Sequence, residues 1–163
     1  MQARINNPVM SVAGALDGIR DFGMSARTTG VAEETLALVQ LRVSQINGCA
    51  VCADMHSREL VHLGTSSERL HTLATWRETP YFSDAERAAL ALAEAATRIA
   101  DNPDAVSDEI WDEAARHYDD QELAGLVVSI AAINAFNRLN ATTRQPTGPW
   151  VAKFVDDAMA ARA

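Results

Sequence analysis

Two cysteines and a histidine lie close together in the sequence and could do chemistry together. Cys49 and Cys52 are the two cysteines of the chain, and His56 follows Cys52 by four positions. On a helix, residues three and four apart lie on one face. The turn formers Asn47 and Gly48 come directly before Cys49, so we expect both cysteines in the first turn of a new helix. Unpaired N–H groups and the helix dipole favour a thiolate there, and the thiolate is the reactive form of cysteine.

The simplest chemistry for these three side chains is a dithiol redox site. Cys52 would be the attacking thiolate, with His56 as its base or ion-pair partner, and Cys49 would be the resolving thiol that closes a disulfide. In a purely structural alternative, the cysteines are small buried apolar residues and His56 is a surface residue. A zinc site is a third alternative, but structural zinc takes four protein ligands, and the remaining histidines, such as His62 and His71, are scattered. We therefore expect no metal.

Polar residues interrupt the most apolar segment of the chain near its end. They are Asn134, Asn137, Arg138 and Asn140. Buried polar groups need hydrogen-bond partners. Two interpretations stay open: these residues hold a subunit interface or an active-site wall, or they form a capped and partly solvated last turn of a helix.

Length and charge restrict the class of protein. The chain has 163 residues, enough for one domain with a sizeable core, and a formal net charge of -8. An acidic surface disfavours nucleic acid and anionic membranes as partners. No apolar run reaches the roughly 20 residues of a membrane span, and residues 1–8 contain no apolar signal-peptide region. Two cysteines three positions apart do not form the disulfide framework of a secreted domain. We therefore expect a cytoplasmic protein.

The chain is rich in Ala, Leu and Glu and poor in strand signals, which predicts an all-α fold. Pairs of Ser, Thr or Asp with Glu three positions later predict helix starts at Thr65/Glu68, Ser83/Glu86 and Asp119/Glu122. A loop is expected over residues 23–30. The predicted helices cover residues 9–22, 31–46, 49–63, 65–76, 84–100, 107–118 and 121–141, with a further helix over 151–161.

These segments predict one domain over residues 1–163, a single-domain helical bundle of about seven helices. The core that carries the cysteine motif spans about residues 30–100. Residues 142–163 are expected to form a C-terminal tail, opened by Pro146, Gly148 and Pro149.

Residues 41–56, which contain the cysteine motif, resemble the core of the alkylhydroperoxidase AhpD-like proteins of the carboxymuconolactone decarboxylase superfamily. Further stretches similar to members of this group lie at residues 76–80, 84–90 and 130–138. The resemblance covers the chain from about residue 30 to 140. The spacing Cys-x-x-Cys-x-x-x-His is specific in this helical context.

The resemblance implies a function for each residue of the motif. Cys52 matches the peroxidatic cysteine, Cys49 the resolving cysteine, and His56 the relay histidine of a peroxidase. The resemblance also implies an all-α homo-oligomer, often a trimer or hexamer, without a bound cofactor. Its partners would be a hydroperoxide substrate and a dithiol reductant, either a lipoyl-bearing or a thioredoxin-type protein.

Two positions depart from the pattern of this group. The best-studied members carry a glutamate at the position of Ala37, where it joins the histidine in a proton relay, and a histidine at the position of Val51. Ala37 cannot transfer a proton. Other carboxylates considered for a substitute role are Glu33, Glu34 and Glu94.

Three functions follow from these observations. The first is a cysteine-dependent alkyl hydroperoxide reductase in antioxidant defence. The second is a thiol redox switch with little or no turnover, which the residue at position 37 favours. The third is a decarboxylase acting on a muconolactone, a reaction that does not need a thiol pair.

Overall fold

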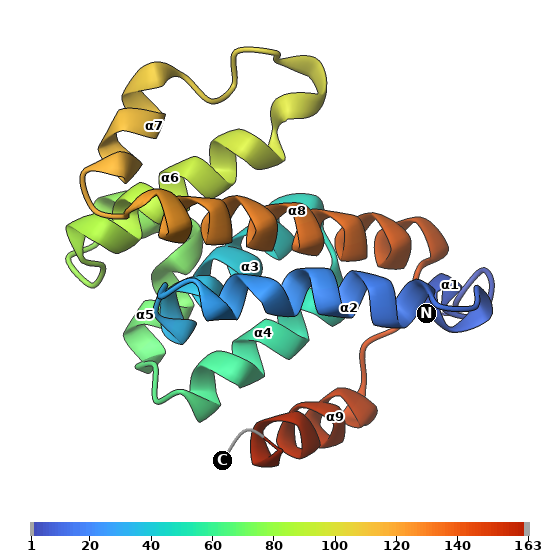
Figure 1. Cartoon of the computed structure of the whole chain (residues 1–163). Helices are drawn as coiled ribbons and strands as arrows, with labels where there is room; N and C mark the ends of the chain where they lie inside the picture. The colour runs from blue at the N-terminus through green and yellow to red at the C-terminus, as the bar shows by residue number, and fades with distance from the viewer. Residues whose placement is uncertain (1, 162–163) are drawn as a thin grey trace.

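The computed structural model describes residues 2–161, and these form helices and no strand (Figure 1). The prediction of an all-α fold is confirmed. Three short 3-10 helices, η1 (Ala26–Thr28), η2 (Leu73–Glu78) and η3 (Ile99–Asp101), join the longer elements. The nine α-helices of the described residues are α1 (Pro8–Ser11), α2 (Ala15–Ser25), α3 (Glu33–Asn47), α4 (Ala50–His62), α5 (Ser67–Thr72), α6 (Asp84–Thr97), α7 (Asp108–Ala115), α8 (Asp120–Thr143) and α9 (Pro149–Ala160).

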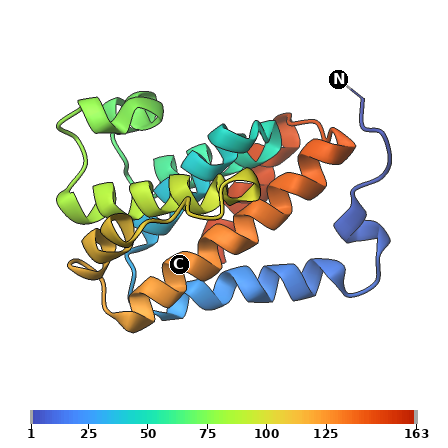
Figure 2. The same cartoon turned by 90° about the horizontal axis from the view of Figure 1, so that it is seen from above.

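Helix α3 lies at the centre of the bundle and packs against α4, α6 and α8. Its apolar stripe, which includes Leu36, Val39 and Val43, is almost fully buried. Helix α2 runs alongside α8, which separates it from α6 in the view from above (Figure 2). The helix that carries the cysteine motif, α4, is therefore held against α3 on one side and against α9 on another.

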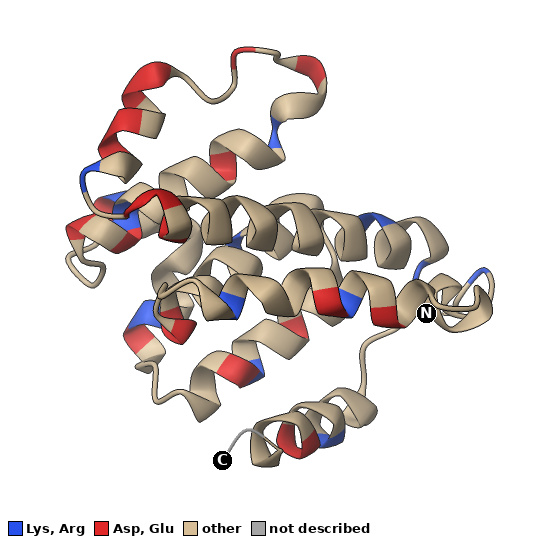
Figure 3. Cartoon of the chain, in the orientation of Figure 1, with Lys and Arg blue, Asp and Glu red and all other residues tan. Residues whose placement is uncertain are grey.

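Helix α8 is the one described helix that is long and apolar enough to cross a membrane. The most apolar window of α8 is 50% buried inside the fold, with Leu126, Ile130 and Ile133 in the core. Figure 3 shows that the middle of this helix carries no charged residue. The core helix of a folded domain meets the same criteria, and α8 occupies that position here.

The predicted helix starts are correct at two of three sites. Ser83 with Glu86 and Asp119 with Glu122 each form a reciprocal capping box. The start predicted at Thr65 is wrong, because Ser66 is the N-cap residue and accepts a hydrogen bond from the backbone N–H of Arg69 at 3.4 Å. Thr65 instead donates its hydroxyl to Glu34 of α3 at 2.7 Å.

The N-terminal part of the chain differs from the prediction. The expected single helix over 9–22 is divided at Gly14, whose φ of 77° breaks it into α1 and α2. The loop expected over 23–30 is wrong, since α2 continues to Ser25 and η1 follows it. Gly23 is not a helix breaker here. A Cβ atom at Gly23 would lie 3.3 Å from the Cβ of Ala132, so this glycine allows α2 to approach α8 closely.

The further helix predicted over 151–161 in the C-terminal tail is confirmed as α9. Helix α9 packs on α4 (Figure 1), with Val151 and Val155 buried. His62 and Asp156 are paired at 2.8 Å between α4 and α9, and Thr147 donates its hydroxyl to Asp54 of α4. The described residues thus contain one α-helix more than the eight predicted segments, because the N-terminal segment divides into α1 and α2.

Candidate functional site

The turn at Asn47 and Gly48 sets the start of the motif helix. Gly48 ends α3 in the left-handed conformation, with φ 67°. Cys49 is the N-cap residue of α4, and its sulfur accepts a hydrogen bond from the backbone N–H of Cys52 at 3.4 Å. The structure thus places Cys49 at the N-terminus of α4 and Cys52 in its first turn, where the helix dipole favours negative charge.

A buried network of asparagines anchors this turn to α8. The side-chain amide of Asn47 donates to Asn134 Oδ1 and to Asn137 Oδ1, both at 2.9 Å. Asn137 in turn donates to Ser44 of α3 at 3.2 Å, and Asn134 donates to Thr97 of α6 at 3.2 Å. Two of the polar residues that interrupt the most apolar helix are therefore internal anchors of the motif, rather than a solvated last turn.

Cys49 and Cys52 form a disulfide, with their Cα atoms 5.4 Å apart. The two residues are only 2% and 3% exposed. Asn140 of α8 donates its side-chain amide to Cys52 Sγ at 3.4 Å. Asn140 therefore forms part of a wall of the site, as one of the two interpretations of these polar residues proposed. A bridge that closes so short a loop adds little stability, which favours a chemical role for the pair.

Cys52 lies at the wall of a cavity of about 540 Å³ between α2, α8, α9 and the start of α4. Most of its lining is apolar. The apolar side chains include Val9, Met10, Leu16, Met24, Ile133, Phe136, Trp150, Phe154 and Val155. The polar side chains of the lining include Arg20, Arg27, Gln40, His56, Glu59 and Asn140. An apolar cavity with a few polar groups at a reactive residue is the usual form of a small-molecule site.

His56 is held by a carboxylate on its own helix. Its Nδ1 lies 3.0 Å from Glu59 Oε2, and Arg27 donates from Nη2 to Glu59 Oε1 at 2.6 Å. All three side chains are largely buried, with exposed fractions of 15% for His56, 9% for Glu59 and 12% for Arg27. An ionised carboxylate only accepts hydrogen bonds, so this contact requires a proton on Nδ1 of His56, and in the neutral ring it leaves the lone pair on Nε2.

Sequence reasoning missed Glu59, Arg27 and Gln40 as parts of this site. The pair His56 and Glu59 stands at i and i+3 on a predicted helix, which is a readable signal for contact. No local pattern links Arg27 to Glu59, because the two are 32 positions apart. Gln40 lines the cavity and donates from Nε2 to Ser129 at 3.1 Å, a contact that also depends on tertiary packing.

The carboxylates considered as substitutes at position 37 make other contacts. Glu33 lies 3.4 Å from Arg27, and Glu34 accepts from Thr65. Glu94 is bound by arginines and a tryptophan outside the cavity. Ala37 itself is completely buried in an apolar cluster. Each of these contacts is made to a residue other than His56.

Glu94 is the centre of a structural ion cluster. Burial alone would raise its pKa, but hydrogen bonds from Arg77, Arg42 and Trp76 outweigh that effect and lower the pKa to about 2. Arg77 also stacks on the Trp76 ring at 4.1 Å. The cluster joins α3, η2 and α6, and none of its members lines the cavity.

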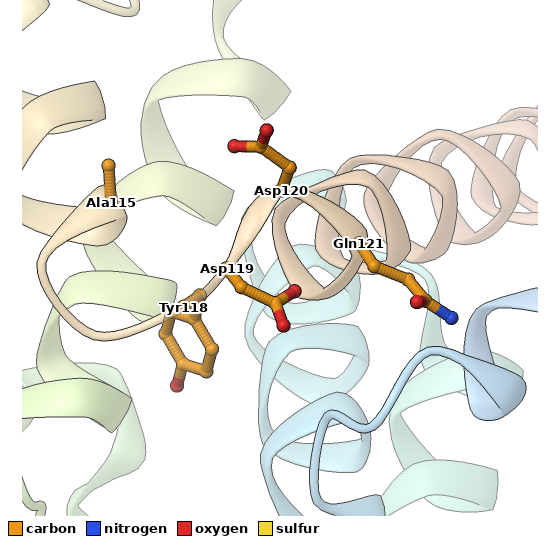
Figure 4. Close-up of a pocket in the computed structure, with 5 residues that line it drawn as sticks. All are labelled: Ala115, Tyr118, Asp119, Asp120 and Gln121. Atoms are coloured by element: carbon orange, nitrogen blue, oxygen red, sulfur yellow. The ribbon is translucent and has the colours of Figure 1, made fainter.

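A second hollow lies where α7 passes into α8 (Figure 4). It is open to solvent, has a volume of about 480 Å³, and is lined by Ala115, Tyr118, Asp119, Asp120 and Gln121. The carboxylates of Asp119 and Asp120 point in different directions (Figure 4), and Asp119 serves as the cap of α8. The polar groups that line this hollow do not converge on one point. Within residues 2–161, no group of three His, Cys, Asp or Glu side chains could hold a metal ion.

Comparison with curated proteins finds relatives in two bacteria. The uncharacterized protein YdfG of Bacillus subtilis (strain 168) is 35% identical over 120 residues, which are 74% of this chain and 80% of YdfG. The uncharacterized protein YnjA of Escherichia coli (strain K12) is 36% identical over 110 residues, which are 68% of this chain. The chain spans 59% of YnjA, less than two thirds of that relative.

Solved structures share the fold. ATU0492 from Agrobacterium tumefaciens, a protein of unknown function described as a candidate antioxidant defence protein AhpD, superposes with a TM-score of 0.83 at 31% identity, over 90% of this chain and 99% of that one. The apo debrominase Bmp8 has a TM-score of 0.73 at 21% identity, over 87% and 75% of the two chains, and at this identity the likeness concerns the fold alone.

A family model supports the same assignment from sequence. Residues 13–95 match the carboxymuconolactone decarboxylase family, and this range includes Cys49, Cys52 and His56. The fold, the relatives and the family model agree with the resemblance seen in the motif. The chain therefore belongs to the carboxymuconolactone decarboxylase family and has the AhpD-like fold.

Proposed function

We propose that this protein is a cysteine-dependent oxidoreductase that reduces organic hydroperoxides. One observation carries the proposal: the sulfur of Cys52 is bonded to Cys49 at the start of a helix, and Cys52 lines an apolar cavity together with His56. A dithiol, a base and a substrate-sized cavity meet at one point. Membership of a family with AhpD-like relatives supports an antioxidant role.

The reaction begins from the reduced dithiol. His56 takes the proton of the Cys52 thiol, and the resulting thiolate attacks the terminal oxygen of the hydroperoxide, so that an S–O bond forms and the O–O bond breaks. The leaving alkoxide takes a proton from His56 and departs as an alcohol. Cys52 is then a sulfenic acid. The thiol of Cys49 attacks its sulfur, the disulfide forms, and the hydroxyl group leaves as water with the Cys49 proton.

A dithiol reductant completes the cycle. It reduces the Cys49–Cys52 disulfide and becomes a disulfide itself, so the net change is hydroperoxide plus dithiol to alcohol, water and disulfide. Both cysteines are almost fully buried. A dithiol on a slender arm, such as a lipoyl group, can reach Cys52 through the cavity more easily than the surface of a thioredoxin-type protein can.

The cavity supports an apolar organic substrate. Its walls include Phe136, Trp150 and Phe154, and its polar groups include His56 and Asn140. A hydroperoxide with an apolar body can bury that body among the aromatic side chains while its peroxide group faces Cys52. We expect hydrogen peroxide, which has no apolar body, to be a poorer substrate.

We also propose a homo-oligomer, a trimer or a hexamer, in a reducing compartment such as the cytoplasm. Large apolar side chains on the N-terminal helices are exposed in the single chain, among them Met10, Val12 and Phe22. Burial of such a surface between subunits would stabilise an assembly. Light scattering on the eluted protein measures the mass; a monomer at micromolar concentration contradicts this part of the proposal.

Peroxide turnover is the experiment that tests the main proposal. The reduced protein is supplied with dihydrolipoamide and cumene hydroperoxide, and peroxide consumption is followed for wild type and Cys52→Ser. We expect many turnovers for wild type and none for the variant. Oxidation of two thiols once, without turnover, would support the redox switch instead. Conversion of a muconolactone by both proteins would support the decarboxylase.

A further inference from the structure

We propose that Glu59, held by Arg27, is the positioning residue for His56. This inference rests on the proposed function for the role of His56. It assigns the orientation of the His56 ring to a carboxylate on the motif helix itself.

The contacts of Glu59 give it two separate tasks. One carboxylate oxygen, Oε2, lies 3.0 Å from His56 Nδ1, and the other, Oε1, accepts from Arg27 at 2.6 Å. The carboxylate is thus shared between a permanent cation and the imidazole. A residue that bridges the two fixes the rotation of the histidine ring and the nitrogen that carries its proton.

Burial makes this arrangement rigid. The side chains of Glu59 and Arg27 are 9% and 12% exposed, so water does not compete strongly for either group. A buried carboxylate is costly unless it is paired and hydrogen-bonded, and Arg27 supplies that pairing. Arg27 also lies 3.4 Å from Glu33 at the start of α3. Glu59 and Arg27 therefore link His56 to the start of α3 rather than to an exposed segment.

The position of the histidine proton decides what His56 can do. With Nδ1–H donated to Glu59, the lone pair of Nε2 is available for the proton that moves between Cys52 and the leaving alkoxide. Without the carboxylate, either nitrogen can carry the proton, and the fraction of molecules with a basic Nε2 falls. The cost of the wrong tautomer in a serine protease triad is far larger than the loss of one ordinary hydrogen bond.

Three variants test this role. Glu59→Gln keeps the size of the side chain but removes the charge, and Glu59→Asp keeps the charge on a shorter stem. Glu34→Gln is the matched control, since Glu34 is a partly buried carboxylate of α3 that bonds Thr65 and Arg69 instead of His56. The cysteines are kept reduced in every sample.

Nitrogen NMR of the reduced protein measures the tautomer directly, and single-turnover oxidation of the dithiol by cumene hydroperoxide measures the rate. We expect neutral His56 to carry its proton on Nδ1 in wild type, and a mixture of tautomers in Glu59→Gln. The oxidation rate should fall about ten-fold or more in Glu59→Gln, recover in part in Glu59→Asp, and stay within about two-fold of wild type in Glu34→Gln.

Two results would overturn the inference. One is a neutral His56 in wild type that carries its proton on Nε2, a measurement that needs no variant to fold. The other is a Glu59→Gln protein whose tautomer and oxidation rate both match wild type. The NMR result does not depend on peroxide chemistry, so it still decides the role of Glu59 if wild type fails to consume peroxide and the proposed function is wrong.

Discussion

At the scale of single residues, the reactivity of Cys52 depends on the donors that face its sulfur. Asn140 donates its amide to Cys52 Sγ at 3.4 Å. A hydrogen bond to a charged acceptor is worth about 1.5–3 kcal/mol, so it should favour the thiolate over the thiol. In a Cys49→Ser background, we expect Asn140→Ala to slow alkylation of Cys52 by iodoacetamide at neutral pH by about ten-fold. Asn140→Asp should slow the alkylation further, because its carboxylate would repel the Cys52 thiolate. Equal alkylation rates in the Cys49→Ser protein and in its two Asn140 variants would contradict a role of Asn140 in activating Cys52.

We expect Glu94 to give the protein a part of its resistance to acid. Its pKa is lowered to about 2 from a usual 4.5 because hydrogen bonds from Arg77, Arg42 and Trp76 outweigh the effect of burial. A lowered pKa means that the cluster stabilises the fold fully above pH 4.5 and loses this contribution as the pH falls toward 2. The contribution is on the order of 3 kcal/mol.

Urea unfolding at several pH values checks this prediction. Wild type should lose stability steeply between pH 4.5 and 2. Glu94→Gln should be less stable at neutral pH, because Arg42 loses its buried counter-charge, and should lose less further stability on acidification. Parallel loss in the two proteins over this range would show that Glu94 does not carry the acid dependence.

At the scale of elements, the turn between α3 and α4 positions the dithiol. Gly48 has φ 67°, a conformation that costs an alanine about 1 kcal/mol. Gly64 offers a matched control, since its φ is 82° and a Cβ there, as at Gly48, would meet nothing within 4 Å. We expect similar destabilisation in Gly48→Ala and Gly64→Ala, measured by thermal unfolding, but slower dithiol oxidation in Gly48→Ala alone. Equal oxidation rates in the two variants would contradict a role of the Gly48 turn in positioning the dithiol.

Much of the element pattern could be predicted from the sequence, because helix periods and caps are local signals. The capping boxes at Ser83 and Asp119 and the break at Gly48 follow from residue type and spacing. Gly23 was misread because a glycine that lets two helices touch has the same local signature as a glycine that ends a helix. The role of Thr65 was misread because its hydroxyl bonds Glu34, which is distant in sequence.

The site shows the same difference between local sequence signals and contacts that depend on tertiary packing. Cys49, Cys52 and His56 could be proposed from spacing alone because all three lie on or at the start of one helix. Glu59 also lies on that helix, but helical spacing alone does not separate a carboxylate that positions a histidine from a surface ion pair. Arg27 lies on η1 and Asn140 on α8, and only tertiary packing shows that they reach the site.

At the scale of the whole molecule, the two ends of the chain complete the cavity. Arg4 bonds its backbone N–H to the carbonyl of Thr143, and α9 returns to cover α4. The cavity walls thus include residues from both termini, such as Val9 and Trp150. A motif core alone would leave Cys52 without the apolar walls that we propose select the substrate.

Trp150 offers a test of this selection. It lines the cavity and is 51% exposed, whereas Trp111 is 41% exposed on α7, outside the cavity. We expect Trp150→Ala to raise the KM for cumene hydroperoxide by about ten-fold while the rate with hydrogen peroxide stays unchanged, since only the organic substrate uses the apolar wall. Trp111→Ala should alter neither value. A KM that stays the same in Trp150→Ala contradicts an apolar substrate site.

The most direct test of the central claim is to trap the intermediate on Cys52. Cys49→Ser removes the resolving thiol, so oxidation by one equivalent of cumene hydroperoxide should stop at a sulfenic acid on Cys52. Dimedone added with the peroxide should label Cys52 stoichiometrically, as mass spectrometry of the digested protein can show. Cys52→Ser, treated in the same way, should remain unlabelled at Cys49. Labelling of Cys49 but not Cys52, or no labelling of either variant, would contradict the account.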